Sequence, residues 1–348
     1  MSDDNGAVRG IDHDAVSDWL SGRVHDAQPP FRFSLITGGH SNLTYRVVDA
    51  KGDVFVLRRP PIGRLLATAH DMAREHRIIS ALGPTPVPVP PALALCEDEA
   101  VNEAPFYVMQ FVEGHVLHTA PQTAKLFDEE KRGVIGRSVV QVLADLHNLD
   151  PDEIGLGTLG KKEDYIARQL KRWTMQWEGS KTRELPAMEE VGAALRDGIP
   201  QQVGAAVVHG DYRLGNMITG EDGEVAAVLD WELCTLGDPL ADVGYLLNNW
   251  AHPGESGESS PESDPPPSAA PGFQTRQQFL ERYSELTGRD TSKVAYYRAF
   301  QYWRLAAICE GVLDRYLKGK MGGSVDTDLY KRRVDSLAAS AVEMIDSL

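Results

Sequence analysis

The sequence predicts an α+β fold with two lobes, a small β-rich N-terminal lobe and a larger, mainly helical C-terminal lobe. Three observations predict it. Short apolar runs bounded by turn residues, which are typical of strands, gather before residue 110. Segments with apolar residues three and four positions apart, typical of amphipathic helices, fill most of the chain after residue 114. Between them, residues 205–232 contain two apolar runs whose ends carry acids and an amide.

The N-terminal lobe is predicted to span residues 1–109, with strands separated by turns. Residues 68–82 carry apolar side chains at helical spacing. Residues 83–93 contain five prolines, which remove backbone donors, so this stretch is predicted to be an extended connector. The predicted elements are a helix at 12–21, strands at 31–36, 44–48 and 54–58, a helix at 68–82, and strands near 92–96 and 106–111.

The C-terminal lobe, residues 115–348, is predicted to be helical apart from the 205–232 segment. Asp238 and Pro239 are typical of a helix start, since Asp caps free N–H groups and Pro at the first position needs none. Residues 252–272 are rich in proline, serine and glycine, which predicts a mobile loop. The predicted helices are 128–149, 163–178, 238–250, 279–288, 294–319 and a last one from about residue 329.

Composition argues against several classes of function. The formal net charge is −16, and nucleic acid is not an expected partner because no basic stripe is available to neutralise its phosphates. No run reaches eighteen apolar residues, and the acidic N-terminal sequence lacks an apolar core, so neither a membrane span nor a signal peptide is predicted. The three cysteines lie far apart, which favours reduced thiols in a cytoplasmic protein over a zinc site.

Residues 205–232 carry the most informative pattern of the chain. The apolar run 205–208 leads into His-Gly-Asp, Asn216 follows Asp211 by five positions, and the run 225–229 ends at Asp230. The turn at 221–224 predicts that the two runs form a short hairpin with its polar residues on one face. Phosphoryl transfer needs such groups, because one carboxylate orients the attacking hydroxyl while an Asn and an Asp bind Mg²⁺ at the phosphates.

The pattern H-G-D-x4-N, followed by a strand and Asp230, resembles that of the aminoglycoside phosphotransferase and choline kinase-like family. The resemblance implies the protein kinase-like fold, with ATP and Mg²⁺ as cofactors. It implies that Asp211 is the catalytic base and that Asn216 and Asp230 bind the metal. Residues 273–320 resemble the branch of this family found as a kinase domain in acyl-CoA dehydrogenase fusion proteins.

A glycine-containing loop, ITGGHSNLTYRV, lies between two predicted strands. Glycines let backbone N–H groups approach phosphates, although two glycines between strands usually make only a turn. The loop resembles the family's G-G-x-S-N loop over ATP, which implies that Gly38, Gly39, Ser41 and Asn42 bind the nucleotide. A Walker A loop is excluded, since no G-K-[ST] follows the glycines.

A strand cation and a helix acid complete the pattern for phosphate binding. Kinases hold the α- and β-phosphates with a strand cation that a helix carboxylate positions. The third predicted strand offers Arg58 and Arg59 where most kinases have lysine, and the next helix offers Glu75. By strand alternation Arg58 shares the face of Val56, whereas Arg59 lies on the other face, so Arg58 is the predicted phosphate ligand.

Residues 110–114 are predicted to be the hinge that binds adenine. Kinase-like proteins hold adenine mainly through backbone groups of this connector. By position, Gln110 and Val112 would supply these groups and Met109 would lie behind the ring, although the same side chains also fit an ordinary core.

Five more polar residues near the hairpin are given supporting roles. His209 is predicted to orient the catalytic loop rather than act as an acid or base. Arg213 could reach the γ-phosphate or stay solvated, and Glu232 could join the metal shell or bind local backbone. Asp238 and Asp242 resemble the family's G-D-P-x-x-D helix start, where one acid caps the helix and the other ties it to the catalytic loop.

The predicted function is ATP-dependent phosphorylation of a hydroxyl group on a small molecule. The fusion-protein branch implies a hydroxyacyl or acyl-CoA substrate, and the aromatic and arginine side chains at 296–304 could line a partly apolar pocket. An aminoglycoside or choline-like substrate is the alternative. From other classes, a pseudokinase regulator would need a broken catalytic set, and a metal-dependent phosphohydrolase would need more ligands than this segment supplies.

Overall fold

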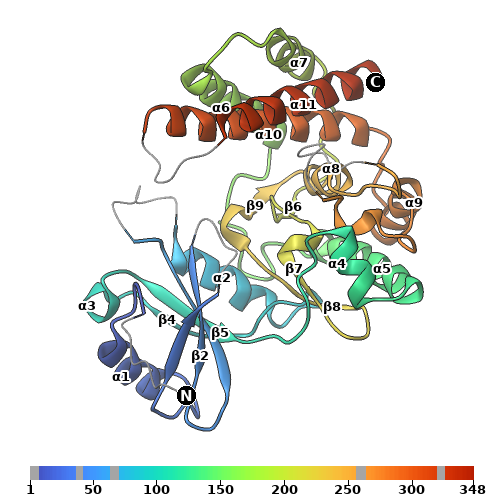
Figure 1. Ribbon diagram of the computed structural model, residues 1–348. Helices are drawn as coiled ribbons and strands as arrows, with labels where there is room; N and C mark the ends of the chain where they lie inside the picture. Colours follow the sequence, from blue (N-terminus) through green and yellow to red (C-terminus); the bar gives the residue numbers. More distant parts are fainter. Residues whose placement is uncertain (1–7, 37–41, 63–69, 256–263, 320–325) are drawn as a thin grey trace. The chain divides into compact units, whose positions relative to one another are not determined.

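The computed structural model describes residues 8–36, 42–62, 70–255, 264–319 and 326–348 (Figure 1). The chain divides into two compact units. Unit 1 comprises residues 1–114 and 226–232, and unit 2 comprises residues 115–225 and 233–348. Residues 226–232, which the sequence assigns to the C-terminal lobe, belong to unit 1, where Val228 N–H donates to Pro88 O over 2.8 Å.

Unit 1 is built on a five-stranded antiparallel sheet with the strand order β1-β2-β3-β5-β4. All five predicted strands are confirmed, each within one residue of its predicted ends, whereas the four-residue α3 is too short to produce a periodic pattern. The elements are α1 (His13–Arg23), β1 (Arg32–Leu35), β2 (Leu43–Val48), β3 (Val54–Arg59), α2 (Met72–Leu82), β4 (Ala92–Cys96), α3 (Glu99–Asn102) and β5 (Phe106–Gln110).

The register of this sheet places Arg58 directly opposite Tyr107 of β5. Paired residues of neighbouring strands present their side chains to the same face, so Arg58 and Tyr107 share one face. The core contains α1 and the centre of the sheet, where Trp19 packs edge-on against Phe106 with ring centroids 4.9 Å apart. Asp12 caps α1 by accepting a hydrogen bond from Ala15 N–H over 3.1 Å.

Unit 2 is mainly helical, and α10 lies at its centre. This helix packs against α6, α7, α8 and α11, and Figure 1 shows α10 and α11 side by side. The long predicted helices are confirmed, but α4 and α7 were not predicted. The elements are α4 (Ala120–Leu126), α5 (Glu129–Asn148), α6 (Tyr165–Ser180), α7 (Pro186–Asp197), β6 (Ala206–Val208), η1 (Leu214–Asn216), β7 (Met217–Thr219), β9 (Thr235–Gly237), α8 (Leu240–Asn248), η3 (Pro267–Ala269), α9 (Arg276–Thr287), α10 (Val294–Leu317) and α11 (Thr327–Asp346); β8 (Val225–Val228) and η2 (Trp231–Leu233) cross the unit boundaries.

The strand pairing of the 205–232 segment differs from the sequence prediction. β6, the first apolar run, pairs antiparallel with β9, from Ala206 opposite Gly237 to Val208 opposite Thr235. The predicted turn instead joins β7 to β8, and Gly220 N–H donates to Glu224 O over 2.9 Å in it. The first run therefore has a partner that lies beyond the hairpin in the sequence.

Helix α8 carries two residues of the site described below, and its close approach to α10 fixes their position. At Gly244 a Cβ atom would lie 2.8 Å from the carbonyl carbon of Tyr297, closer than side chains are found in proteins. Glycine therefore allows the two helices to touch by their backbones.

Three further predictions from the sequence concern the loop at 252–272, the cysteines and membrane spans. Within the segment predicted to be mobile, residues 267–270 are buried, and Pro271 O accepts a hydrogen bond from the Arg132 side chain. All three cysteines are buried, and none of them forms a disulfide bond. None of the helices in the described ranges is both long and apolar enough to cross a membrane.

Candidate functional site

The catalytic loop predicted from the sequence lies in unit 2, between the end of β6 and the 3-10 turn η1. Gly210 has φ +85°, and a Cβ there would lie 3.0 Å from both Leu233 Cβ and Leu233 O, so glycine is required. The His209 ring packs edge-on against Tyr212, and its Nδ1 accepts a hydrogen bond from Asp211 N–H over 3.2 Å. His209 is fully buried, and this hydrogen bond joins its ring to the loop that it was predicted to orient.

Asp211 and Asn216 are in direct contact. Asn216 Nδ2 donates to the Asp211 main-chain oxygen over 2.9 Å and to its Oδ2 over 2.6 Å. The amide nitrogen is thereby committed to Asp211, whereas Asn216 Oδ1 accepts no hydrogen bond from the described residues. An amide oxygen in this state is suited to bind a hard cation.

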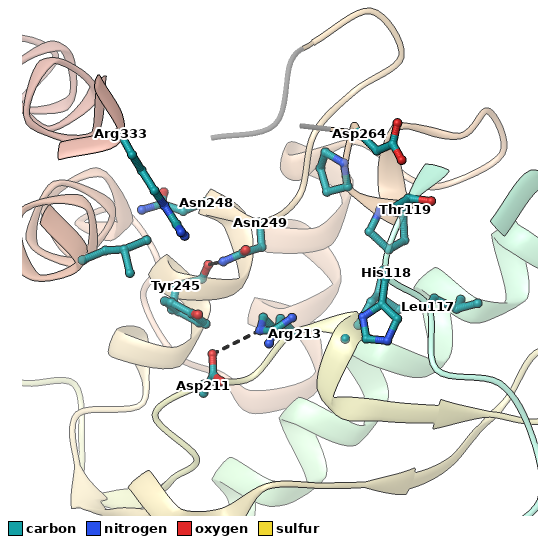
Figure 2. A pocket seen from close by; sticks show the side chains of 15 residues that line it. Leu117, His118, Thr119, Asp211, Arg213, Tyr245, Asn248, Asn249, Asp264 and Arg333 are labelled. Atoms are coloured by element: carbon teal, nitrogen blue, oxygen red, sulfur yellow. Dashed lines mark hydrogen bonds and ion pairs between the residues drawn. The ribbon is translucent and has the colours of Figure 1, made fainter. Parts of the chain in front are cut away.

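Two further side chains hold the Asp211 carboxylate. Arg213 Nε lies 3.3 Å from Asp211 Oδ1 (Figure 2). The Tyr245 hydroxyl donates a hydrogen bond to the same carboxylate. Burial, and next the negative charge of Asp211, raise the pKa of Tyr245, so its hydroxyl remains a donor. Sequence reasoning left the role of Arg213 open and missed Tyr245.

Asp242 fastens the loop to α8. Its carboxylate accepts hydrogen bonds from His209 N–H over 2.6 Å and from Gly210 N–H over 2.8 Å. His147 Nε2 lies 3.4 Å from the same carboxylate, and His147 Nδ1 lies 2.8 Å from the Tyr283 hydroxyl. The second acid of the G-D-P-x-x-D segment therefore ties the helix to the loop, while Asp238 accepts from Leu240 N–H at the helix start.

The buried His147–Asp242 pair should make the stability of the protein depend on pH. Burial lowers the pKa of His147 below its usual value near 6.5, against the opposing effect of Asp242. As the pH falls below about 6.5, His147 becomes protonated in the unfolded chain but stays neutral in the folded chain. The free energy of unfolding then falls by up to about 1.4 kcal/mol for each unit by which the two pKa values of His147 differ. Although burial alone would raise the pKa of Asp242, the bonds from His147 and the loop lower it, which adds a loss below about pH 4.

We therefore expect urea unfolding to give a smaller free energy of unfolding at pH 5.5 than at pH 7.5. His147→Gln should reduce this difference, and part should remain because burial also lowers the pKa values of His70, His76 and His118. His25→Gln is the matched control, since that side chain is 94% exposed. An unchanged pH dependence in His147→Gln would refute the prediction.

Arg304 of α10 supports the loop from another side. Its side chain is 9% exposed, stacks on the Trp173 ring, and directs Nη1 and Nη2 at the Gly210 carbonyl, each over 3.4 Å. Of the predicted pocket residues at 296–304, Arg304 borders a cavity of about 160 Å³ that Asp211 also lines. The aromatic residues Tyr296, Tyr297, Tyr302 and Trp303 are buried in the core.

Asp211 also opens on a larger cavity of about 510 Å³ within unit 2 (Figure 2). Two acids, Asp211 and Asp264, and two arginines, Arg213 and Arg333, line it together with neutral polar and apolar side chains. Its volume falls in the range of small-molecule sites.

The second group of predicted site residues lies in unit 1. Arg58 Nε is 2.9 Å from Glu75 Oε2, and Arg58 Nη2 is 2.5 Å from Asp230 Oδ1. The Arg58 and Glu75 side chains are only 14% and 3% exposed. Arg59 instead donates to the Pro60 and Gly10 main-chain oxygens, so Arg58 is the arginine that faces the helix acid.

Three more side chains complete this group. The Tyr107 hydroxyl donates to Glu75 Oε2 over 3.1 Å, a contact that sequence reasoning missed. Asn42 Nδ2 donates to Glu75 Oε1 over 3.1 Å and to Glu232 Oε2 over 3.3 Å. Burial raises the pKa of Glu75, against the opposing charge of Arg58.

Asp230 has an unusual backbone conformation. Its φ is +66°, in the left-handed region that non-glycine residues seldom occupy and that Asp and Asn tolerate best. Such conformations cluster at functional sites, where the surrounding structure compensates their cost. Within the described residues no group of three or more His, Cys, Asp or Glu is placed to hold a metal.

The predicted hinge residues follow the end of β5. Met109 is buried, Gln110 is exposed, and Val112 lies beyond the strand. Gln110 N–H already donates to Pro91 O over 2.9 Å, whereas Val112 N–H has no partner among the described residues. Gly38, Gly39 and Ser41 lie outside the described residues.

Comparisons with known proteins show a similarity to phosphotransferases. The model of the phosphotransferase enzyme family (APH) matches residues 32–290. Acyl-CoA dehydrogenase family member 10 of Mus musculus is 36% identical over 315 residues, which cover 89% of this chain and 29% of that protein. The chain spans less than half the length of the curated relatives it matches.

Two solved structures are similar along their whole length. A protein of Ralstonia eutropha JMP134, provisionally named an aminoglycoside phosphotransferase, has 34% sequence identity and a TM-score of 0.83, with 97% of this chain and 99% of that chain covered. The ADP-bound aminoglycoside phosphotransferase APH(2'')-Ib has 14% identity and a TM-score of 0.58, with 96% and 99% covered. At that identity the second likeness concerns the fold alone.

Proposed function

The chain belongs to the phosphotransferase enzyme family, and from this premise we propose that it transfers the γ-phosphate of ATP to a hydroxyl group of a small molecule. The resemblance inferred from the sequence and the protein kinase-like fold are both confirmed. The single observation that carries the proposal is the Asp211 carboxylate, which is held by its neighbours and opens on a cavity of about 510 Å³.

Asp211 is the proposed catalytic base. The substrate hydroxyl would donate to a carboxylate oxygen of Asp211, which takes the proton as the new O–P bond forms and the bond between the γ-phosphorus and the β–γ bridging oxygen breaks. Asn216, Tyr245 and Arg213 fix the carboxylate in one orientation, and alignment of this kind contributes much of the rate in phosphoryl transfer.

The proposed nucleotide ligands are those predicted from the sequence. Arg58, held by Glu75, would bind phosphate oxygens, and the glycine-containing loop would bind the nucleotide through Gly38, Gly39, Ser41 and Asn42. In the hinge, the Val112 N–H, which donates to none of the described residues, is the better adenine donor, since the Gln110 N–H is engaged, and Met109 would lie behind the ring.

Asn216 Oδ1 and the Asp230 carboxylate are the proposed Mg²⁺ ligands. Both are oxygen donors of the kind Mg²⁺ prefers, and this ion commonly keeps waters and phosphates as its other ligands. When bound, the metal would offset the negative charge of the phosphates. In the structure, the positive charge of Arg58 balances the negative charge of Asp230.

A hydroxyacyl or hydroxyacyl-CoA compound is the proposed substrate. Supporting this choice, a mouse protein named as an acyl-CoA dehydrogenase family member contains the matching segment. The apolar side chains Leu117, Leu214 and Leu305 in the lining of the cavity could accommodate an acyl chain.

The test is ADP release from Mg·ATP across hydroxyl-bearing compounds. The set should include 3-hydroxybutyryl-CoA, an aminoglycoside, choline, ethanolamine and sugars. We expect turnover of the hydroxyacyl thioester, and selective turnover of an aminoglycoside would overturn the substrate assignment. Mg-dependent protection by ATP against thermal unfolding, without turnover of any compound, would point to a pseudokinase.

A further inference from the structure

Arg333 on α11 projects into the cavity that contains Asp211 (Figure 2). Its Nε is buried without a hydrogen-bond partner, and the side chain has no ion pair with any described residue. An unsatisfied buried donor of this kind costs free energy and requires an explanation.

Arg333 differs from the neighbouring arginines in having no acid partner among the described residues. Arg213 is paired with Asp211 in the same cavity, and Arg183, which also reaches α11, is paired with both Glu310 and Asp335. Asp264 is the remaining acid among the described lining residues, and Figure 2 shows it on the side of the cavity away from Arg333. Among the described residues, no acid is therefore paired with the positive charge that Arg333 presents to the cavity.

We propose that Arg333 determines specificity by binding an anionic group of the substrate, a carboxylate or a phosphate, while the substrate hydroxyl lies at Asp211. The guanidinium group suits both anions, because its planar set of donors can bind two oxygens at once. The substrate class is then an anionic hydroxy compound with a short apolar part. This inference rests on the proposed function of the Asp211 cavity and adds the charge of its ligand.

The same arrangement disfavours a polycationic substrate. A site for several ammonium groups needs an excess of acids, whereas the described lining has two acids and two arginines, and one acid is already paired with Arg213. A cation in this cavity would also lie close to the positive charge of Arg333, which no described acid pairs with.

Binding without ATP tests the inference separately from catalysis. Calorimetric titration should use three probes: coenzyme A for phosphate, 3-hydroxybutyrate for carboxylate, and 1,3-butanediol as the uncharged relative of 3-hydroxybutyrate. We expect the wild type to bind at least one anion, and the probe that binds identifies the anionic group. Arg333→Met should raise its Kd at least tenfold, and Arg333→Lys should restore part of the affinity.

The matched control is Arg332→Met, on the exposed side of the same helix, which should bind like the wild type. Arg333→Met should also unfold at no lower temperature than the wild type, because Arg333 makes no hydrogen bond or ion pair with a described residue that its loss would break. Equal affinity of Arg333→Met and wild type, or binding of neither anion by the wild type, would overturn the inference. Anion binding that needs Arg333, without phosphorylation of any hydroxyl, would instead overturn the proposed function alone.

Discussion

Asp211→Asn should lower the rate of phosphoryl transfer about a thousandfold while the Kd for Mg·ATP stays within about threefold, as general base catalysis contributes about 10²–10⁴-fold. Asparagine keeps the size of aspartate and can still accept from the Tyr245 hydroxyl, and the bond from Asn216 to the main-chain oxygen remains. The substitution removes the ability to take a proton, the charge that pairs with Arg213, and one of the two acceptor oxygens that face Asn216 and Arg213.

Two measurements separate the outcomes for this variant. Single-turnover ADP formation reports the chemical step, and protection by Mg·ATP against thermal unfolding reports binding. Glu190→Gln, which removes an exposed acid of α7, should match the wild type in both. Turnover retained within tenfold, or nucleotide binding lost from a folded variant, would contradict the role of Asp211.

The contact between Asp211 and Asn216 could be predicted because it is local. Five residues separate them, and the loop and η1 between them allow few arrangements. Strand alternation put Arg58 on the face of Val56 and Arg59 on the other face, and Arg58 is the arginine that pairs with Glu75. In both cases the pattern within one or two elements decides the geometry.

The contacts that sequence reasoning missed depend on the packing of distant elements. β6 pairs with β9. Arg304 of α10 and Arg333 of α11 each line one of the two cavities that Asp211 also lines. Neither arginine is marked by a motif. Tyr245 could have been found, because it lies three positions after Asp242 on α8, so both share the helix face toward the catalytic loop.

Asp230→Asn should differ from Asp211→Asn in its main effect. It should weaken Mg-dependent ATP binding, whereas Asp211→Asn should lower the rate and leave that binding nearly unchanged. Asparagine tolerates the left-handed conformation at φ +66°, whereas alanine would add a backbone cost of about 1–2 kcal/mol that is unrelated to the metal. The substitution removes the negative charge that Mg²⁺ would bind. The loss in affinity should exceed about 100-fold, because changing residues that merely support metal ligands costs about 10–100-fold.

The magnesium dependence is the decisive measurement for Asp230→Asn. Thermal protection by ATP should be recorded with Mg²⁺ and with excess chelator, and the variant with Mg²⁺ should behave like the wild type with chelator. Stability itself should change little, since Arg58 keeps its contact with Glu75 and the Asp230 side chain is 31% exposed. If ATP protects the variant and the wild type equally in Mg²⁺, Asp230 is not a metal ligand, and its left-handed backbone and contact with Arg58 serve the folded structure alone.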